Sequence, residues 1–260
     1  MNILQHNREA WNRESRGGSP WARPVDAEVI KEALAGRWEV ILTPNRPVPR
    51  HWFGDLQGKR VLCLASGGGQ QAPVLAAAGA QVVSYDLSDE QLAKDQFVAA
   101  RDGLNIRCLR GDMADLSAFA ANAFDLIFHP VSNVFVPDVR PVWRACYRVL
   151  RPGGRLLAGF MNPGFFLFDH DAAKTAEDLV VTFPLPYREP ESLSDDGRAA
   201  LAESGRPLEF SHSLEAQIGG QIAAGFILRD LYEDYWDDEA TPLNKFSPTY
   251  IATWAEKADG

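Results

Sequence analysis

Short apolar runs alternate with helical segments along the middle of the chain. Five runs have the length and residue types of strands: 61–65, 81–86, 105–109, 123–129 and 155–160. Helices are predicted between them at 70–78, 88–101 and 140–150. Ser88 is a good N-cap for the second of these helices, and Gly103 ends it. This alternation is typical of a parallel sheet with helices on both faces.

Two further helices are predicted before the first strand, at residues 1–16 and 26–34, followed by a proline-rich irregular connection at 43–58. Because helices in this position cannot join a parallel sheet, we expect both to lie across the carboxyl ends of the strands and to help cover a ligand. Trp11 and Trp21 are candidates to line that cover. Packing of the helices onto the core is the more common use of such tryptophans.

The alternation breaks after the fifth strand. Residues 161–211 contain an aromatic cluster, a short β-forming run at 179–183 and a polar section with turn residues at 189–207. The chain then continues with a helix at 213–224, a strand at 226–232, an acidic loop at 233–239 and a last strand at 249–254. We expect an N-terminal helical cover and connection (1–57) and a main domain (58–260), with the insertion at about 161–211 over the ligand edge.

A glycine triplet follows the first predicted strand, and Asp86 ends the second. Glycines permit backbone conformations closed to other residues and let a ligand approach the backbone N–H groups. A carboxylate at the tip of the next strand is placed to accept hydrogen bonds from ribose hydroxyls. These features indicate a nucleoside-containing cofactor. The triplet also satisfies the dinucleotide pattern G-x-G-x-x-G/A, so a nicotinamide or flavin enzyme stays open at this point.

Later motifs distinguish between these cofactors. The chain contains VLCLASGGGQ, VVSYDLS, RGDM, FDLIF, YRVLRPGGRLL, AAGFILRDLYED and PTYIATWAEK in this order. Over roughly Gly58 to Lys257 it resembles the class I S-adenosylmethionine-dependent methyltransferases, in particular the small-molecule group called methyltransferase type 11 or 25. The resemblance implies an α/β, Rossmann-like seven-stranded sheet, mostly parallel with an antiparallel last strand, and S-adenosyl-L-methionine as the cofactor.

The resemblance also implies roles for individual residues. Backbone N–H groups around Ser66 to Gly69 would face the methionyl carboxylate, Asp86 the ribose and Asp112 the adenine amine, with Met113 against the ring. The full set of cofactor-binding candidates is Ala65, Ser66, Gly67, Gly69, Asp86, Leu87, Asp112, Met113 and His129. Two positions depart from the family, which usually has an acidic residue at Cys63 and a glycine at Ala65.

Methyl transfer from a sulfonium is an in-line displacement that requires alignment of the nucleophile and exclusion of water. His129 is the candidate general base, because it ends the fourth predicted strand where this fold places its substrate. Alternatively, His129 closes the strand through a backbone hydrogen bond or touches only the cofactor. The substrate candidates are Asn133, which follows the fourth strand, and four residues near the cover and the insertion: Trp21, Phe165, Tyr187 and His212.

The amino-acid composition limits the kinds of molecule that the protein is expected to bind. A net charge of −9 and a pI near 5.1 argue against nucleic-acid binding and favour a small neutral or cationic substrate. No apolar run approaches the roughly 20 residues that a membrane span needs, and the N-terminus lacks a signal-peptide pattern, so we expect a cytoplasmic protein without a membrane partner. Cys63, Cys108 and Cys146 are too scattered for a disulfide framework and are predicted to be buried free thiols.

No metal site is predicted. Residues 169–171 (Asp-His-Asp) are metal-ligand types, but adjacent positions on one loop rarely converge on an ion, so solvated surface is the preferred interpretation. The predicted function is S-adenosylmethionine-dependent methylation of a small, partly apolar molecule. The alternatives are a nicotinamide-dependent oxidoreductase and a protein that binds S-adenosylmethionine without turnover. The acceptor and the oligomeric state are left open.

Overall fold

The structure, a computed structural model, describes residues 2–237 and 239–259. Met1 of the first predicted helix and Asp238 of the predicted acidic loop therefore lie outside the described residues. The seven strands are β1 (Arg60–Leu64), β2 (Gln81–Asp86), β3 (Ile106–Arg110), β4 (Phe124–His129), β5 (Leu150–Met161), β6 (Phe226–Asp234) and β7 (Tyr250–Lys257). They form one sheet in the order β3-β2-β1-β4-β5-β7-β6. Strands β1 to β5 pair in parallel, and β7 is antiparallel to both of its neighbours, as predicted.

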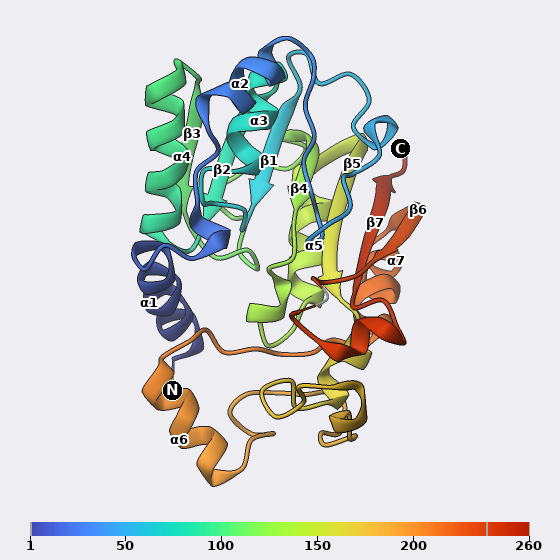
Figure 1. The fold of residues 1–260 in the computed structure, drawn as a ribbon. Helices are drawn as coiled ribbons and strands as arrows, with labels where there is room; N and C mark the ends of the chain where they lie inside the picture. The colour runs from blue at the N-terminus through green and yellow to red at the C-terminus, as the bar shows by residue number, and fades with distance from the viewer. Residues whose placement is uncertain (1, 238, 260) are drawn as a thin grey trace.

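The α-helices are α1 (Ile3–Arg16), α2 (Ala27–Leu34), α3 (Gln71–Ala77), α4 (Asp89–Asp102), α5 (Arg140–Val149), α6 (Asp195–Ser204) and α7 (Gly220–Ala223). Figure 1 shows α2, α3 and α4 on one face of the sheet and α5 and α7 on the other. Helix α1 and the insertion lie beyond the end at which the parallel strands finish. This arrangement is the predicted Rossmann-like architecture with helices on both faces.

Strand β1 shows why the chain forms two core layers. Val61 and Cys63 point into the layer that contains α2 and α3, whereas Leu62 and Leu64 point into the layer around Trp143 of α5. All four β1 side chains are fully buried. A strand covered on both faces needs a continuous apolar run instead of an alternating one, which is what residues 61–64 supply. Burial of each such side chain contributes about 1.5–3 kcal/mol.

The N-terminal helices differ from the prediction in one respect. Helix α1 lies across the carboxyl end of the sheet, but α2 packs on α3 and α4, with Ile30 and Ala33 in the core. The prediction for α2 was therefore wrong. The apolar stripe of α2 fits the helix layer on this face of the sheet. Helix α2 therefore packs there, although no strand precedes it in the chain.

The insertion also differs from the sequence prediction. Residues 179–183 form no strand, only an isolated bridge between Phe168 and Val181, and Val180 and Val181 are largely exposed. In contrast, the section predicted to be turns contains α6. The helix has recognisable ends, because the Ser194 hydroxyl accepts from the Gly197 N–H and Gly205 adopts a left-handed C-terminal conformation.

Element boundaries shift by a few residues elsewhere. Strand β5 begins at Leu150, ahead of the predicted start at Arg155, and β6 extends into the predicted acidic loop. The predicted helix at 213–224 begins with a π-helical stretch, Glu215–Gly219, that continues into α7. The three cysteines are free, with Cys63 and Cys146 fully buried and Cys108 half-buried. No helix in the described part of the chain combines the length and apolarity that crossing a membrane requires.

Candidate active site

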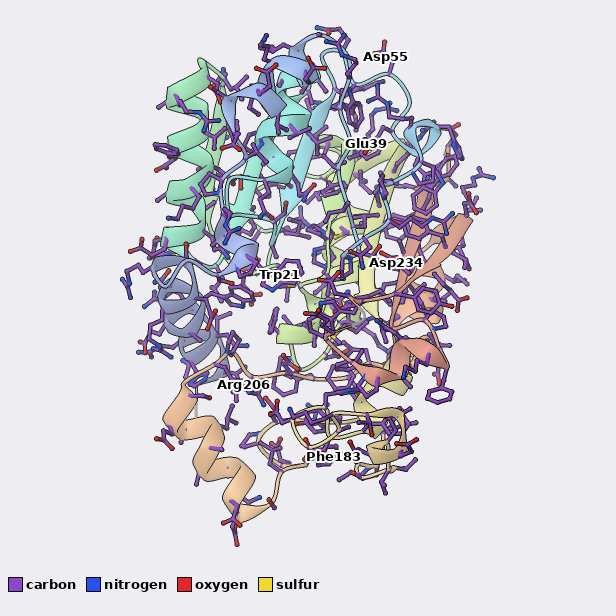
Figure 2. The ribbon with its side chains drawn as sticks, in the orientation of Figure 1. Trp21, Glu39, Asp55, Phe183, Arg206 and Asp234 are labelled. Carbon is purple, nitrogen blue, oxygen red and sulfur yellow. The ribbon has the colours of Figure 1, made fainter. Side chains whose placement is uncertain are left out.

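A cavity of about 1100 Å³ opens at the carboxyl ends of the parallel strands. One end is formed by the turn after β1 and the tips of β2 and β3, and the other by the insertion. Figure 2 shows Trp21 on the side formed by the N-terminal segment, and Arg206 and Phe183 in the insertion. Ligand pockets usually measure about 300–1,000 Å³, so this one has room for two small molecules side by side.

The three glycine N–H groups of the turn after β1 are all bonded within the protein. Gly67 donates to the Asp86 Oδ2 atom (3.0 Å), Gly68 to the Gln91 carbonyl (3.0 Å) and Gly69 to the Asp95 Oδ1 atom (2.8 Å). The sequence predicted that these N–H groups face a ligand. In the structure they instead hold the turn against β2 and α4, and Gly69 is not among the residues that line the cavity.

The chain's own N-terminal segment covers this turn. Val25 donates its N–H to the Gly69 carbonyl (2.9 Å), and the Gln70 amide donates to the Pro20 carbonyl (2.8 Å). A Cβ on Gly68 would lie 2.5 Å from the Trp21 carbonyl oxygen, which real Cβ atoms do not tolerate. The glycine at this position is therefore required by the approach of residues 20–25, in addition to its φ of +119°.

Asp86 lies at the tip of β2 and lines the cavity. Its Oδ1 atom accepts from the Ser88 N–H (2.9 Å), and its Oδ2 atom accepts from Gly67. Burial raises the pKa of the Asp86 carboxyl above its usual value, and the hydrogen bonds from Ser88 and Gly67 oppose that shift. Each oxygen retains a lone pair, so the side chain is held in place and can still accept a further donor.

Two buried polar atoms beside Asp86 have no hydrogen-bond partner within the described residues. They are the hydroxyl oxygen of Ser66 and the side-chain carbonyl oxygen of Gln91, and both residues line the cavity. Buried polar groups in native structures are nearly always paired. Their position at the Asp86 end of the cavity therefore points to a polar ligand there.

The turn after β3 completes this end of the cavity. Asp112 accepts the Ala114 N–H at its Oδ1 atom (2.9 Å), a local turn that fixes the side chain, and Asp112 also lines the cavity. Met113 and Leu87 line it as well. The structure thus brings together Ala65, Ser66, Gly67, Asp86, Leu87, Asp112 and Met113 from the predicted cofactor-binding set.

His129 does not belong to this group. Its ring is fully buried, its Nδ1 atom lies 2.9 Å from the Leu64 carbonyl oxygen, and it is not among the residues that line the cavity. Burial lowers the pKa of His129 to about 4, partly offset by the bond to Leu64. The structure thus shows the backbone contact of the alternative interpretation and places His129 behind the cavity wall, and its role as a general base stays a prediction.

The predicted substrate residues divide into two groups. Trp21, Phe165 and Tyr187 line the cavity. Asn133 and His212 do not: the Asn133 side chain pairs with Gln217, and the His212 Nε2 atom lies 3.0 Å from the Asn133 carbonyl oxygen. Both are buried, and the Asn133–Gln217 pair ties the π-helical stretch to the segment after β4, so their contact with substrate stays a prediction.

The insertion end contains charged residues that the sequence did not single out. Glu189 is buried and accepts hydrogen bonds from Arg206, from the Tyr187 hydroxyl (2.6 Å) and from the Glu209 N–H (3.0 Å). Arg206 binds both carboxylate oxygens, at 2.5 and 2.9 Å. No local motif marks this network, because its members lie on two segments of an irregular region, 187–189 and 206–209.

Aromatic side chains form the rest of this end. Phe165 stacks on His170 with ring centroids 3.7 Å apart, and Phe166 stacks on Tyr187 at 5.5 Å. His170 and Asp169 are half-buried and Asp171 is exposed, as expected for a solvated loop, and all three residues also line the cavity. Burial lowers the pKa of His170, which keeps the ring neutral near pH 7.

Sequence comparisons place these features in a known family. A family model described as a methyltransferase domain matches residues 62–158. An uncharacterized methyltransferase of Bacillus subtilis strain 168, YbaJ, is 46% identical over 255 residues, which are 98% of this chain and 98% of that protein. A ubiquinone biosynthesis O-methyltransferase of Bordetella pertussis is 31% identical over 167 residues, or 59% of this chain and 69% of that protein.

Solved structures resemble the fold. An S-adenosylmethionine-dependent methyltransferase from Mesorhizobium loti aligns with a TM-score of 0.61 and 20% identity, covering 80% of this chain and 95% of that one. A Burkholderia thailandensis 1,6-didemethyltoxoflavin-N1-methyltransferase, with 1,6-didemethyltoxoflavin and S-adenosylhomocysteine bound, aligns with a TM-score of 0.57 and 16% identity, covering 98% and 88%. At these identities the likeness concerns the fold alone.

Proposed function

Because the chain belongs to the S-adenosylmethionine-dependent methyltransferases, we propose that it methylates a small-molecule acceptor held at the insertion end of the cavity. The observation that carries this proposal is the continuous cavity of about 1100 Å³, which joins the Asp86 end to the aromatic insertion end. A cofactor at one end and an acceptor at the other would share one space shielded by α1 and the insertion.

The residues at the Asp86 end fit S-adenosylmethionine. We propose that the Asp86 carboxylate accepts hydrogen bonds from the ribose hydroxyls and that Asp112 accepts from the adenine amine. The Ser66 hydroxyl and the Gln91 side-chain oxygen, which have no partner among the described residues, supply a donor and an acceptor for the polar methionyl part. Met113 offers an apolar side chain for the adenine ring.

The bound cofactor supplies an activated methyl group and its own leaving group. The protein's own contribution is alignment of the two ligands and exclusion of water. The mutually packed aromatic rings of the insertion and the N-terminal segment over the glycine turn serve these two needs.

Isothermal titration with S-adenosylhomocysteine tests the cofactor site. We expect one binding site in the wild type and at least a tenfold weaker one in Asp86→Ala, a loss of about 1.4 kcal/mol or more. Asp55→Ala is the control, because Asp55 lies in an exposed loop at the opposite end of the molecule (Figure 2). Equal affinities in the wild type and Asp86→Ala would contradict the assignment.

Two competing functions are separable by the same protein preparation. A nicotinamide enzyme would gain thermal stability from NAD⁺ or NADP⁺ and not from S-adenosylhomocysteine. A protein that only binds the cofactor would retain it and give no methylated product from any member of a broad acceptor panel. The cytoplasmic location, the absence of a nucleic-acid partner and the boundary at residue 57 stay predictions from the sequence.

A further inference from the structure

We infer that the acceptor carries a positively charged nitrogen group, which the Glu209 carboxylate binds within the aromatic wall of the cavity. This inference rests on the proposed function and names the chemical class of its acceptor. The binding site is defined by Glu209, Asp171 and the aromatic side chains around them, and we call it the acceptor subsite.

The first step concerns Arg206, the cation beside the subsite. Arg206 donates to both oxygens of Glu189, at 2.5 and 2.9 Å, and this bidentate pair is completed by the Tyr187 hydroxyl. Such a pair satisfies the guanidinium and the carboxylate together. Arg206 is therefore hydrogen-bonded to Glu189, and within residues 2–237 and 239–259 it donates no hydrogen bond to the Glu209 carboxylate.

The second step concerns Glu209, the carboxylate next to this pair. Its backbone N–H donates to Glu189 (3.0 Å), but its carboxylate accepts no hydrogen bond from any residue in the ranges 2–237 and 239–259. The side chain lies half-buried in the cavity wall. An ionised carboxylate in that position is costly unless a donor or a cation meets it.

The charges that face Glu209 make the subsite negative. Burial raises the pKa of Glu209 to about 7, Arg206 opposes the shift, and Glu189 and Asp171 add to it. The other titratable groups around it are Tyr187 and Tyr250, whose pKa values are raised, and these phenols are neutral near pH 7. His170 is neutral as well. An anionic acceptor would be repelled, whereas a cation would restore the charge balance.

The aromatic wall suits the same ligand. Trp236 links Phe165 (5.9 Å between centroids) to Tyr250 (5.8 Å), and Phe183 meets Tyr187 edge to face at 5.1 Å. Rings packed on one another in this way lose little entropy when a ligand binds. Their faces attract ammonium groups by about 0.5–2 kcal/mol each, and their apolar surface accommodates the rest of the molecule.

Binding of three matched probes to the protein saturated with S-adenosylhomocysteine tests the subsite. The probes are benzyltrimethylammonium, benzyl alcohol and benzoate. Their binding is measured by the change in tryptophan fluorescence at pH 7.5. We expect the cation to bind at least tenfold more tightly than the other two. Similar affinities for all three would overturn the inference.

The variant Glu209→Gln should reduce the preference for the cation at least tenfold, whereas Glu177→Gln, at an exposed position of the insertion, should keep it. The wild-type affinity for the cation should rise between pH 6 and 8 as Glu209 ionises, and Glu209→Gln should lack this rise. A preference that persists unchanged in Glu209→Gln would overturn the inference, as would a flat pH dependence in the wild type.

The cofactor titration separates this inference from the proposed function. If S-adenosylhomocysteine binds and the probes do not discriminate by charge, only the acceptor class is wrong. If S-adenosylhomocysteine fails to bind the wild type, the proposed function fails and the inference fails with it. Folding of Glu209→Gln is checked by its affinity for S-adenosylhomocysteine, which should match the wild type, and by a melting temperature at pH 7.5 no lower than that of the wild type.

Discussion

Asp95 of α4 is the carboxylate that holds the turn after β1. It is fully buried, and it accepts hydrogen bonds from the Gly69 N–H (2.8 Å) and the Ser84 hydroxyl (2.6 Å). Cys63, the position where the resembling methyltransferases usually carry an acid, lies close enough for Asp95 to raise its thiol pKa further. In this chain the carboxylate beneath the turn therefore comes from Asp95 of α4. In the resembling methyltransferases an acidic residue usually stands in β1 instead.

Asp95 should make stability depend on pH. Burial raises its pKa from 3.8 to about 7, although Ser84 and Gly69 lower it and Asp86 raises it. Between these two values the folded protein holds a proton that the unfolded chain releases, so this contribution is complete below about pH 4 and is lost as the pH rises through 7. We expect the melting temperature of the wild type, relative to Asp95→Asn, to fall from pH 5 to pH 8.

The comparison with Asp95→Asn cancels the contribution of groups that do not interact with Asp95, such as Glu209, and reports on Asp95 and its coupling to Asp86. The amide keeps an acceptor oxygen for the Gly69 N–H. A constant difference in melting temperature across this pH range would show that the carboxyl is not protonated in the folded protein.

The sequence could place some of these residues and not others. Asp86 and Asp112 were found because they follow strands, and the carboxyl ends of parallel strands meet at one edge. His129 also follows a strand, but its side chain turns back to the Leu64 carbonyl, and only the structure shows that direction. Glu209 was missed because its significance depends on Arg206 being bound by Glu189, a fact of three-dimensional pairing.

At the scale of elements, the glycine turn lies where the sequence predicted it. Its glycines are needed for more than the predicted contact with a ligand. Its conformation is as expected, with φ of +119° at Gly68 and +76° at Gly69. However, its N–H groups are bonded to β2 and α4, and its outer side contacts residues 20–25. The turn is therefore a joint between the cover and the sheet as well as one wall of the site.

Gly68→Ala tests whether the close contact between the turn and residues 20–25 is needed for binding in the cavity. The new Cβ would force the Trp21 carbonyl away, so we expect a lower melting temperature and at least a tenfold loss of affinity for S-adenosylhomocysteine in calorimetric titration. Gly36→Ala is the matched control, since Gly36 has a φ of +84° and a Cβ added there would meet no atom within 4 Å. It should lose about 1 kcal/mol of stability through backbone strain and keep its affinity. Equal affinity losses in both variants would refute a specific contact with Trp21.

The regular elements were more predictable than the insertion for a physical reason. Strands and helices buried on two faces show their periodicity in the sequence, as residues 61–64 do. The insertion has no sheet to pair with, so residues 179–183 remain outside any strand despite their β-forming side chains. Helix α6 has a weak apolar pattern, and only its capping residues, Ser194 and Gly205, mark it.

At the scale of the whole molecule, α1 fastens the insertion over the site. The Asn7 amide donates to the Phe135 carbonyl (2.9 Å), and its oxygen accepts the Leu208 N–H (2.8 Å). Trp11 packs edge to face on Phe135, with ring centroids 5.0 Å apart. Near its other end α1 reaches α4, where the Asn12 side chain contacts the Ser88 hydroxyl (2.7 Å). One helix thus spans from the Asp86 end of the cavity to the insertion end.

Asn7→Ala should loosen this closure. It leaves the Leu208 N–H and the Phe135 carbonyl without their partner, at a cost of about 1–3 kcal/mol for each group that stays buried. We expect faster proteolysis of residues 189–208 and a higher KM for the acceptor, with a smaller effect on cofactor affinity. Gln5→Ala, on the exposed side of the same helix, should behave like the wild type. Unchanged proteolysis in Asn7→Ala would show that α1 does not hold the insertion.

The layers of the molecule could be predicted from the sequence. The contacts by which α1 and the insertion close over the cavity could not. The order of strands and helices already implies a sheet covered on both faces. The contacts of Asn7 join residues 128 and 201 positions apart, and no local pattern predicts such pairings. For the same reason the sequence could not show that α1 covers the site while α2 packs on the sheet.

The large sequence separation between Asn7 and its partners also affects the order in which parts of the protein can fold. Domains acquire structure as the chain leaves the ribosome, and contacts between distant residues form late, because a large loop must close first. Helix α1 is synthesised before the sheet, yet its partner Leu208 emerges 201 residues after Asn7. Residues 60–113, which supply the Asp86 end of the cavity, are therefore synthesised well before this partner of α1 exists. Docking of α1 on Leu208 has to wait until the insertion has been made, and a chain stopped before residue 208 would lack the contact that fastens α1 to the insertion.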